Sequence, residues 1–243
     1  MEVFFRFPHT PHLKWLGKGA PRDDKVLSSA EADALLDGTI VVEEKIDGAN
    51  LGFSIDGHAQ IHAQNRGQYL TEPYHGQFSR LPSWLSQHAD LLREALTCEL
   101  ILFGEWCAAR HSLQYSALPD WFLLFDVYDC TVGRFWNTAR RNALAKAACL
   151  VTVPEVFRGR TTLSALSERV MNTSSQYRGE RPLEGLVVRR ESLDWCEARA
   201  KLVHTDFTQA IDTHWRKRAI EWNRTDHLPG SNNSLVGKAK ERP

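Results

Sequence analysis

The sequence predicts an α+β protein whose sheets are mainly antiparallel. Three observations support this: β-branched apolar runs occur in neighbouring pairs, helical patterns separate the pairs, and strict β-α-β alternation is absent. The chain has 243 residues, of which 42% are hydrophobic and 10% aromatic, so it can bury a substantial core. We expect one large domain over residues 1–203, a helical region over 204–228 packed on it, and a tail over 229–243.

A loop-rich segment opens the chain, and the first regular elements follow it. Residues 1–27 are rich in Pro, Lys and His and predict loops with at most one strand. Ser28 and Glu31 form a capping-box pattern, which predicts a short helix through Leu36. The β-branched run 39–44 then predicts a strand.

A hairpin and an amphipathic helix are predicted next. The runs 51–55 and 59–64 flank Asp56 and Gly57, and this dipeptide favours a hairpin because it tolerates the positive φ of a tight turn. Apolar residues recur at helical spacing over 83–97, which predicts a helix with one buried face.

Strands and helices then follow one another to the end of the predicted domain. Dense apolar runs predict strands, and cap residues followed by a 3.6-residue period predict helices. The predicted strands are 99–103, 121–128, 183–190 and 199–203. The predicted helices are 137–149, 162–171 and 205–223, the last being the longest. The polar composition after Pro229 predicts that the tail is disordered.

The charge balance and the short apolar runs exclude several classes of protein. Thirty basic and thirty acidic residues give no formal net charge, so a polyanion must bind through a local patch. The longest apolar run, 121–125, is far shorter than the ~20 residues of a bilayer span. The five cysteines form no C-x-x-C pair, which disfavours disulfides and a cysteine zinc site. We therefore expect a reduced, soluble, cytoplasmic monomer without a membrane partner.

The sharpest local feature is a lysine at the end of a predicted strand. Lys45 stands just before a turn at Gly48, and Asp47 follows two residues after the lysine. A free lysine titrates near ~10.4 and is a poor nucleophile until its ammonium form is destabilised. Gly48 would let the backbone approach a phosphate. Taken alone, these residues fit a surface turn better than an active site.

Four further segments change that interpretation. Three of them place a carboxylate at or beside an apolar strand, and the fourth places two cations on one face of a strand, as a phosphate-binding site requires. Each segment has a simple structural explanation, but the four together in this order are improbable by chance. In chain order they are Phe103-Gly104-Glu105, Leu124-Phe125-Asp126, Glu184-Gly185-Leu186-Val187-Val188 and Arg199-Ala200-Lys201.

This ordered set resembles motifs I, III, IIIa, IV and V of the covalent nucleotidyltransferases, which include DNA ligases, RNA ligases and capping guanylyltransferases. The resemblance covers about residues 43–203. Asn50, five residues past the lysine, and the run 65–67 (Asn-Arg-Gly) resemble the RNA ligase 2 type, whereas DNA ligases and capping enzymes usually have Arg at the position of Asn50. The resemblance implies the nucleotidyltransferase fold, which is ATP-grasp-like, with antiparallel sheets beside a nucleotide pocket. Too few residues follow Lys201 for an OB-fold domain.

The resemblance implies that Lys45 attacks the α-phosphate of ATP and holds AMP through a phosphoramidate. The AMP would pass to a 5′-phosphate, and a 3′-hydroxyl would then displace it to seal the strand. For the nucleotide, the resemblance implies that Glu44 meets the adenine edge and that Phe125, rather than Phe103, stacks on the base. Glu105 would accept hydrogen bonds from the ribose, and Arg66 would bind ribose or phosphate.

The resemblance also implies residues for metal, phosphate and nucleic acid. Glu184, helped by Asp47, would position Mg²⁺ (or Mn²⁺) through waters, because this ion dehydrates reluctantly. Lys201 and Arg199 would neutralise charge on the α-phosphate. The family commonly has Lys at the position of Arg199, and this substitution is not automatically neutral. Asn50 would contact the polynucleotide.

A basic group on the last predicted helix is the best candidate for contact with a nucleic-acid backbone. Its members are Arg216, Lys217 and Arg218. A solvated helix face explains the same pattern equally well.

The sequence thus predicts an ATP-dependent RNA ligase that joins 5′-phosphate and 3′-hydroxyl ends of RNA, or of RNA/DNA nicks, in RNA repair. The same chemistry allows a minimal DNA nick ligase or a guanylyltransferase. A catalytically idle protein that binds nucleic-acid ends is the alternative from another class.

Overall fold

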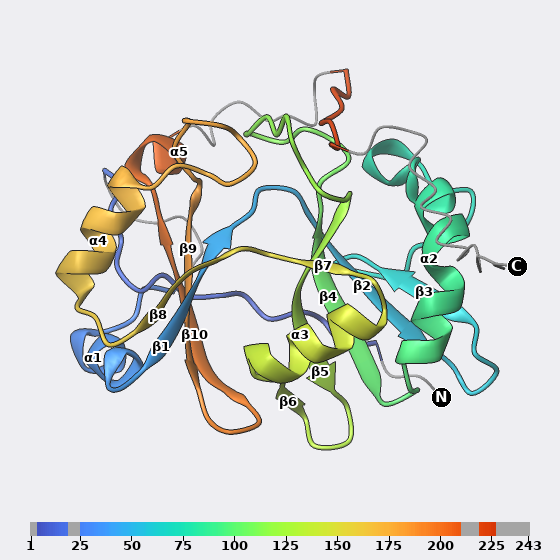
Figure 1. Ribbon diagram of the computed structural model, residues 1–243, viewed down its shortest axis with the longest axis horizontal. Helices are drawn as coiled ribbons and strands as arrows, with labels where there is room; N and C mark the ends of the chain where they lie inside the picture. The colour runs from blue at the N-terminus through green and yellow to red at the C-terminus, as the bar shows by residue number, and fades with distance from the viewer. Residues whose placement is uncertain (1–3, 19–24, 210–218, 227–243) are drawn as a thin grey trace, which may run out of the picture.

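The computed structural model describes residues 4–18, 25–209 and 219–226. Two sheets stand side by side, and helices cover their outer sides (Figure 1). The strands pair antiparallel except where β7 (Val151–Thr152) runs parallel to β5. The predicted α+β class with mainly antiparallel sheets is confirmed, and neither sheet closes into a barrel among the described residues.

The first sheet has four strands in the order β10-β9-β1-β8. Its strands are β1 (Ile40–Lys45), β8 (Glu155–Gly159), β9 (Gly185–Glu191) and β10 (Cys196–Val203). The registers place Lys45 opposite Gly185 and Lys201 opposite Val187. Residues from the first, fourth and fifth predicted motifs therefore lie on neighbouring strands.

The second sheet has the path β3-β2-β4-β5-β6, with β7 beside β5. Its longer strands are β2 (Ala49–Ile55), β3 (Ile61–Gln64), β4 (Leu100–Trp106) and β5 (Phe122–Asp129), and β6 (Arg134–Phe135) is short. β1 ends in the first sheet and β2 begins in the second, so the turn over 46–48 carries the chain from one sheet to the other.

Each sheet has its own hydrophobic core because its helices bury one apolar face against it. The helices α1 (Ser29–Leu36) and α4 (Leu163–Asn172) pack on the first sheet, while α2 (Leu81–Ala95) and the end of α3 (Thr138–Ala147) pack on the second. A 3-10 turn spans Gly76–Phe78. The predicted capping box at Ser28 is present. No helix in the described part of the chain is long and apolar enough to cross a membrane.

The turn between the sheets needs glycine at position 48 for a packing reason. A Cβ atom on Gly48 would lie 2.6 Å from the carbonyl oxygen of Trp106, closer than real Cβ atoms approach. The missing side chain lets this turn lie directly on the end of β4, beside Glu105.

The structure differs from the prediction in the turn of the hairpin, and it has a strand that was not predicted. In the hairpin, the positive φ of 58° falls on Ala59, not on Gly57, because the Asp56 carboxylate accepts from the N–H groups of His58 and Gln60 and shapes a longer loop. An unpredicted strand, β8, follows Pro154.

A helix was predicted over 205–223. The structure has a helix, α5, at the start of this range (Thr205–Gln209), but helical structure does not reach residue 223. Residues 219–226 are not helical, and Trp222 forms a bridge with Ala109. The Asn223 amide donates to the Cys107 carbonyl and accepts from the Tyr115 N–H, which holds this segment against the domain. Arg216, Lys217 and Arg218 lie outside the described residues.

Candidate active site

A cavity of about 590 Å³ opens where the turn between the two sheets meets strands from both. This volume suits a small-molecule ligand. Of the predicted site residues, the cavity wall includes Glu44, Lys45, Asn50, Arg66, Glu105, Phe125, Arg199 and Lys201. Glu184 and Asp47 lie next to this wall. Glu184 pairs with Lys45, and both carboxylates raise the pKa of Lys45.

Lys45 forms the central contact of the site. Its Nζ atom lies 2.6 Å from both carboxylate oxygens of Glu184. The contact follows from the register, because Lys45 stands opposite Gly185, the neighbour of Glu184. The Lys45 side chain is still 26% exposed, so a molecule in the cavity can reach the nitrogen.

The carboxylates near Lys45 keep its amine protonated at rest. Burial alone would lower the pKa of Lys45, but its interactions with Glu184 above all, and with Glu105 and Asp47, outweigh burial and raise the pKa. Burial raises the pKa of Glu184, and Lys45 opposes that shift. Cations that offset these carboxylates would therefore favour the neutral amine, the form of lysine that can act as a nucleophile.

Asp47 is anchored away from the cavity wall. Its Oδ2 atom accepts from the N–H groups of Ser112 and Leu113, each at 2.7 Å, and the Tyr115 hydroxyl accepts from the N–H of Asp47. Burial raises the pKa of Asp47, opposed by Lys45 and by these N–H donors. This carboxylate therefore holds the turn and contributes its charge to the site.

The acidic residues around Lys45 suit a cation. No group of three or more His, Cys, Asp or Glu within the described residues is placed to hold a metal ion. Glu184 and Glu105 are the carboxylates next to Lys45 that a hydrated divalent ion could approach. The Asn50 Oδ1 atom is buried without a hydrogen-bond partner and lines the same cavity, so it offers a further acceptor or contact point for a ligand.

Glu105 gives a testable dependence of stability on pH. Burial, opposed by Lys45, raises the pKa of Glu105 to about 8, whereas an unfolded glutamate titrates near ~4.3. The folded protein retains this proton over that interval, so the stability contributed by the group is present below about pH 4.3 and is lost as the pH rises through about 8. The free energy of unfolding should therefore fall between about pH 4.3 and about pH 8. We expect urea titrations to show that Glu105→Gln removes the part of this fall that Glu105 causes.

The matched control for this prediction is Glu94→Gln, an exposed position on α2, which should keep the wild-type profile. Equal slopes for the wild type and Glu105→Gln between pH 5 and pH 8 would contradict it.

A β-bulge turns Phe125 into the cavity. The β4–β5 register shifts between Phe103 and Gly104, so Phe125 has no partner on β4. Neighbouring strand residues normally point to opposite faces, yet Phe125 and Asp126 both line the cavity because the bulge interrupts that alternation. Phe103 is fully buried and does not line the cavity, in keeping with the preference for Phe125.

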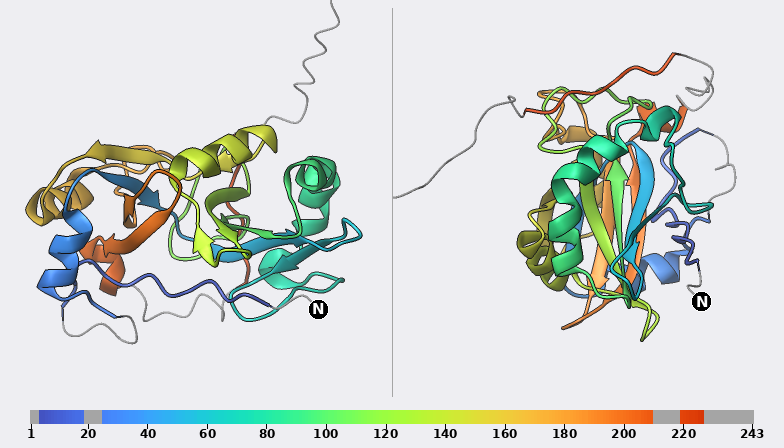
Figure 2. Two further views of the ribbon diagram at one scale, coloured as in Figure 1. Left: turned by 90° about the horizontal axis from the view of Figure 1, so that it is seen from below. Right: turned by 90° about the vertical axis from the view of Figure 1, so that its right-hand side faces the viewer.

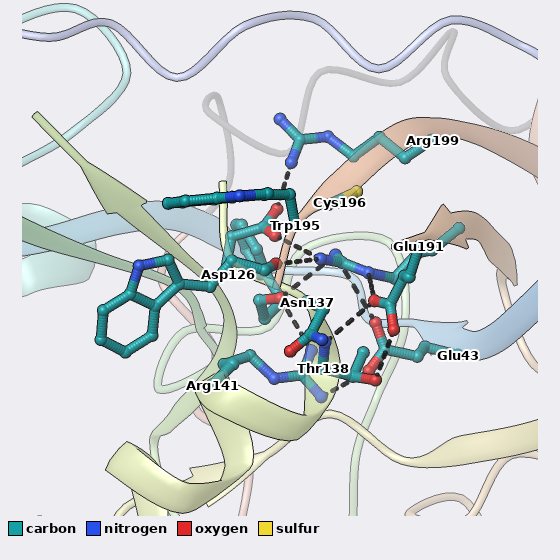
Figure 3. Close-up of polar contacts among 12 residues, drawn as sticks. Glu43, Asp126, Asn137, Thr138, Arg141, Glu191, Trp195, Cys196 and Arg199 are labelled. Atoms are coloured by element: carbon teal, nitrogen blue, oxygen red, sulfur yellow. Dashed lines mark hydrogen bonds and ion pairs between the residues drawn. The ribbon is translucent and has the colours of Figure 1, made fainter. Parts of the chain in front are cut away.

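A buried charge network forms the floor of the cavity and joins the two sheets (Figure 3). Arg189 on β9 lies 2.8 Å from Asp126 on β5 and 3.0 Å from Glu191. Arg141 on α3 lies 2.6 Å from Glu43 on β1 and donates to the free carbonyl of Phe125. With Arg199, which also pairs with Asp126, the network has three cations and three carboxylates, and it surrounds the bulge.

The two cations of β10 have different surroundings. Arg199 lies 2.5 Å from Asp126 and stacks on aromatic rings. Lys201 lines the cavity, and its charge acts on Glu184. Glu44 lines another part of the wall, where its Oε2 atom accepts from the N–H of Gln176 and burial raises its pKa.

Several residues of the cavity wall were not predicted as site residues from the sequence. They are Phe7, His9, Thr10, Glu43, Gln77, Phe78, His111, Asp126 and Arg189. Asp126 lies in a predicted motif, and Arg189 lies on the predicted strand 183–190 directly after another. Strand alternation places Arg189 on the same face as Val187, so a buried role was detectable. Glu43 lies on the predicted strand 39–44, two residues before Lys45, whereas the others lie outside the strands, where no local pattern indicates their positions.

A family model described as RNA ligase matches residues 38–203. No curated protein matches the chain. The chain is similar to a Naegleria gruberi RNA ligase mutant solved with AMP and Mn, at 16% identity and a TM-score of 0.61, covering 86% of this chain and 59% of that one. It is also similar to a mutant of the same ligase solved with ATP and Mn, at 16% identity and a TM-score of 0.60, covering 85% and 58%.

The chain thus spans less than two thirds of the length of these solved proteins. At this level of identity the likeness concerns the fold. The family match covers the stretch of the predicted motifs together with the strand before them.

Proposed function

The chain belongs to the RNA ligase family, and we propose that it is an ATP-dependent ligase that seals RNA ends through a covalent lysyl-AMP intermediate. The contact between Lys45 and Glu184 at the wall of the cavity carries this proposal. It places a nucleophile among carboxylates and beside a second cation, Lys201, in a space of suitable size. The similar ligases solved with AMP or ATP and Mn support the choice of nucleotide and of a divalent metal.

In the first step the neutral amine of Lys45 attacks the α-phosphorus of ATP. A P–N bond forms, the P–O bond to pyrophosphate breaks, and the amine loses a proton. Lys201 lowers the cost of charge on the α-phosphate. A divalent metal held near Glu184 through waters would supply further positive charge, which favours the neutral form of Lys45 and stabilises the leaving pyrophosphate.

The cavity wall suits an adenine nucleotide. We infer that Phe125 stacks on the base, because the bulge turns its ring into the cavity. Glu44 would face the adenine edge, Glu105 would accept from the ribose, and Arg66 would bind ribose or phosphate. The raised pKa of Glu105 has burial as its main cause, so bound cations would favour its ionised form.

In the later steps AMP passes to an RNA 5′-phosphate, and a 3′-hydroxyl displaces it. Asn50 would contact the polynucleotide, because it lines the cavity close to Lys45 in the chain and its Oδ1 atom has no protein partner. Arg216, Lys217 and Arg218 remain our proposed backbone contacts. We infer a role in RNA repair, on nicks or broken ends.

A two-stage assay tests this function. The protein is incubated with α-labelled ATP or GTP and Mg²⁺ or Mn²⁺, then denatured, and the retained label is measured. We expect label from ATP; label from GTP alone would support a guanylyltransferase, and no label would support a protein that merely binds ends. Nicks with RNA or DNA on either side then separate RNA sealing from DNA sealing.

Asn50→Ala should damage sealing more than self-adenylation. The side chain would position the polynucleotide, and its loss misplaces the reacting ends, so we expect sealing to fall by about 100-fold while lysyl-AMP forms within a few-fold of the wild-type rate. Single-turnover assays of each step measure the two rates. Asn172→Ala, at the exposed end of α4, is the control. Equal damage to both steps would refute the assignment.

A further inference from the structure

Arg199 is already engaged by protein groups. Its Nη1 atom lies 2.5 Å from Asp126 Oδ2, and the Arg199 side chain is 10% exposed (Figure 3). Its guanidinium carbon lies 4.6 Å from the ring centre of Phe7 and 4.1 Å from that of Phe135. A planar guanidinium can present its face to a ring while its N–H groups point at a carboxylate, whereas a lysine ammonium is a compact, strongly hydrated charge without that fixed geometry.

One of these rings belongs to a segment that spans both sheets. We call residues 5–13 the strap. It runs past both sheets on the side opposite α3 (Figure 2). At the second sheet, the Phe5 carbonyl accepts from the Gln64 amide and Arg6 donates to the carbonyl of Arg66. At the first sheet, Lys201 exchanges backbone hydrogen bonds with the strap through Pro11 and Leu13.

Phe7 fixes the middle of the strap beside the cavity. Its side chain is 4% exposed, and its ring lies 5.2 Å from that of Phe125 and 5.6 Å from that of Phe135. The next strap residues, His9 and Thr10, line the cavity. A shift of Phe7 would therefore move this part of the wall and would also change the packing of the Phe125 ring.

We propose that Arg199, paired with Asp126 and with its guanidinium in contact with the rings of Phe7 and Phe135, is a positioning residue that fastens the strap and thereby holds Phe125. Lys201 is then the one cation of the pair that acts on phosphate. The proposal explains why arginine stands where the family commonly has lysine: a carboxylate and two rings surround this position, and they suit a planar cation with directed donors. The expected effect on the use of ATP rests on the proposed function, whereas the expected effect on the strap does not.

Arg199→Lys keeps the charge and removes the stack. We expect hydrogen exchange measured by mass spectrometry to show about tenfold faster exchange in the strap, the change produced by losing about 1.4 kcal/mol of local stability. The ATP concentration for half-maximal lysyl-AMP formation should rise several-fold, while the maximal rate changes less. Arg190→Lys, on the neighbouring strand, is the matched control because Arg190 donates to the Ala34 carbonyl and not to this cluster.

Phe7→Leu gives a second, independent variant. It removes one ring from the stack without touching Arg199, and we expect the same faster exchange of the strap and weaker use of ATP. If both variants exchange like the wild type, the proposal fails. It also fails if Arg199→Lys lowers the maximal rate alone and leaves strap exchange unchanged, since that result describes a phosphate ligand. Should the wild type form no lysyl-AMP, the proposed function falls, yet the exchange measurement still decides the role of Arg199.

Discussion

Lys45→Ala is expected to abolish covalent attachment of AMP, a loss of at least about 10⁴-fold. The methyl group has no nitrogen to form the P–N bond, so residual binding of ATP cannot produce an adduct. Label retained after denaturation, from α-labelled ATP, measures the effect. Sealing of a nick whose 5′ end already carries AMP should survive better than sealing that starts from ATP.

The control is Lys25→Ala. Lys25 also lies 2.6 Å from a glutamate, Glu31, but this pair is exposed, so we expect wild-type labelling. Thermal unfolding must accompany the assay, because Lys45→Ala leaves Glu184 near Glu105 without its cation. A folded Lys45→Ala variant that still retains label would place the nucleophile elsewhere and refute the proposed function.

Arg189→Met is expected to have the largest effect on stability. Arg189 is 1% exposed and lies 2.8 Å from Asp126 and 3.8 Å from Glu43. Burial opposes the charge of Arg189, but Asp126 and Glu43 outweigh it and raise its pKa. Methionine fills similar space but leaves the buried carboxylates one cation short, because Asp126 then keeps only Arg199 and Glu43 keeps only Arg141. Removing one partner of a buried ion pair costs about 3–5 kcal/mol, so we expect a loss of that size in urea unfolding.

Arg190→Met is the matched control on the same strand. Arg190 donates to the carbonyl of Ala34 and lies outside the buried network, so its loss should cost less than about 1 kcal/mol. Equal costs for the two substitutions would show that the network is not what joins the sheets. Asp126→Asn combined with Arg189→Met should recover part of the lost stability, because it removes one uncompensated charge.

Short-range patterns predicted most regular elements of this fold. The capping box at Ser28, the cap at Asn137 and the strand ending at Lys45 all depend on a few consecutive residues, and each is present. The helix expected to reach residue 223 was wrong in its last part because Asn223 pairs with the backbone of Cys107 and Tyr115. Those partners are more than a hundred residues away, and no local pattern contains them.

The sequence by itself determined the order of the motifs, the class of the fold and the set of charged residues that could serve one site. Only the tertiary structure decided which of these residues meet. Lys45 and Glu184 lie 139 positions apart, and the pairing of β1 with β9 brings them together. The bulge at Phe125 and the ring stack that holds Arg199 likewise arise from packing between separate strands and the strap. The physical reason is that periodicity and capping act within a few residues, whereas ion pairs and ring contacts depend on how distant segments pack.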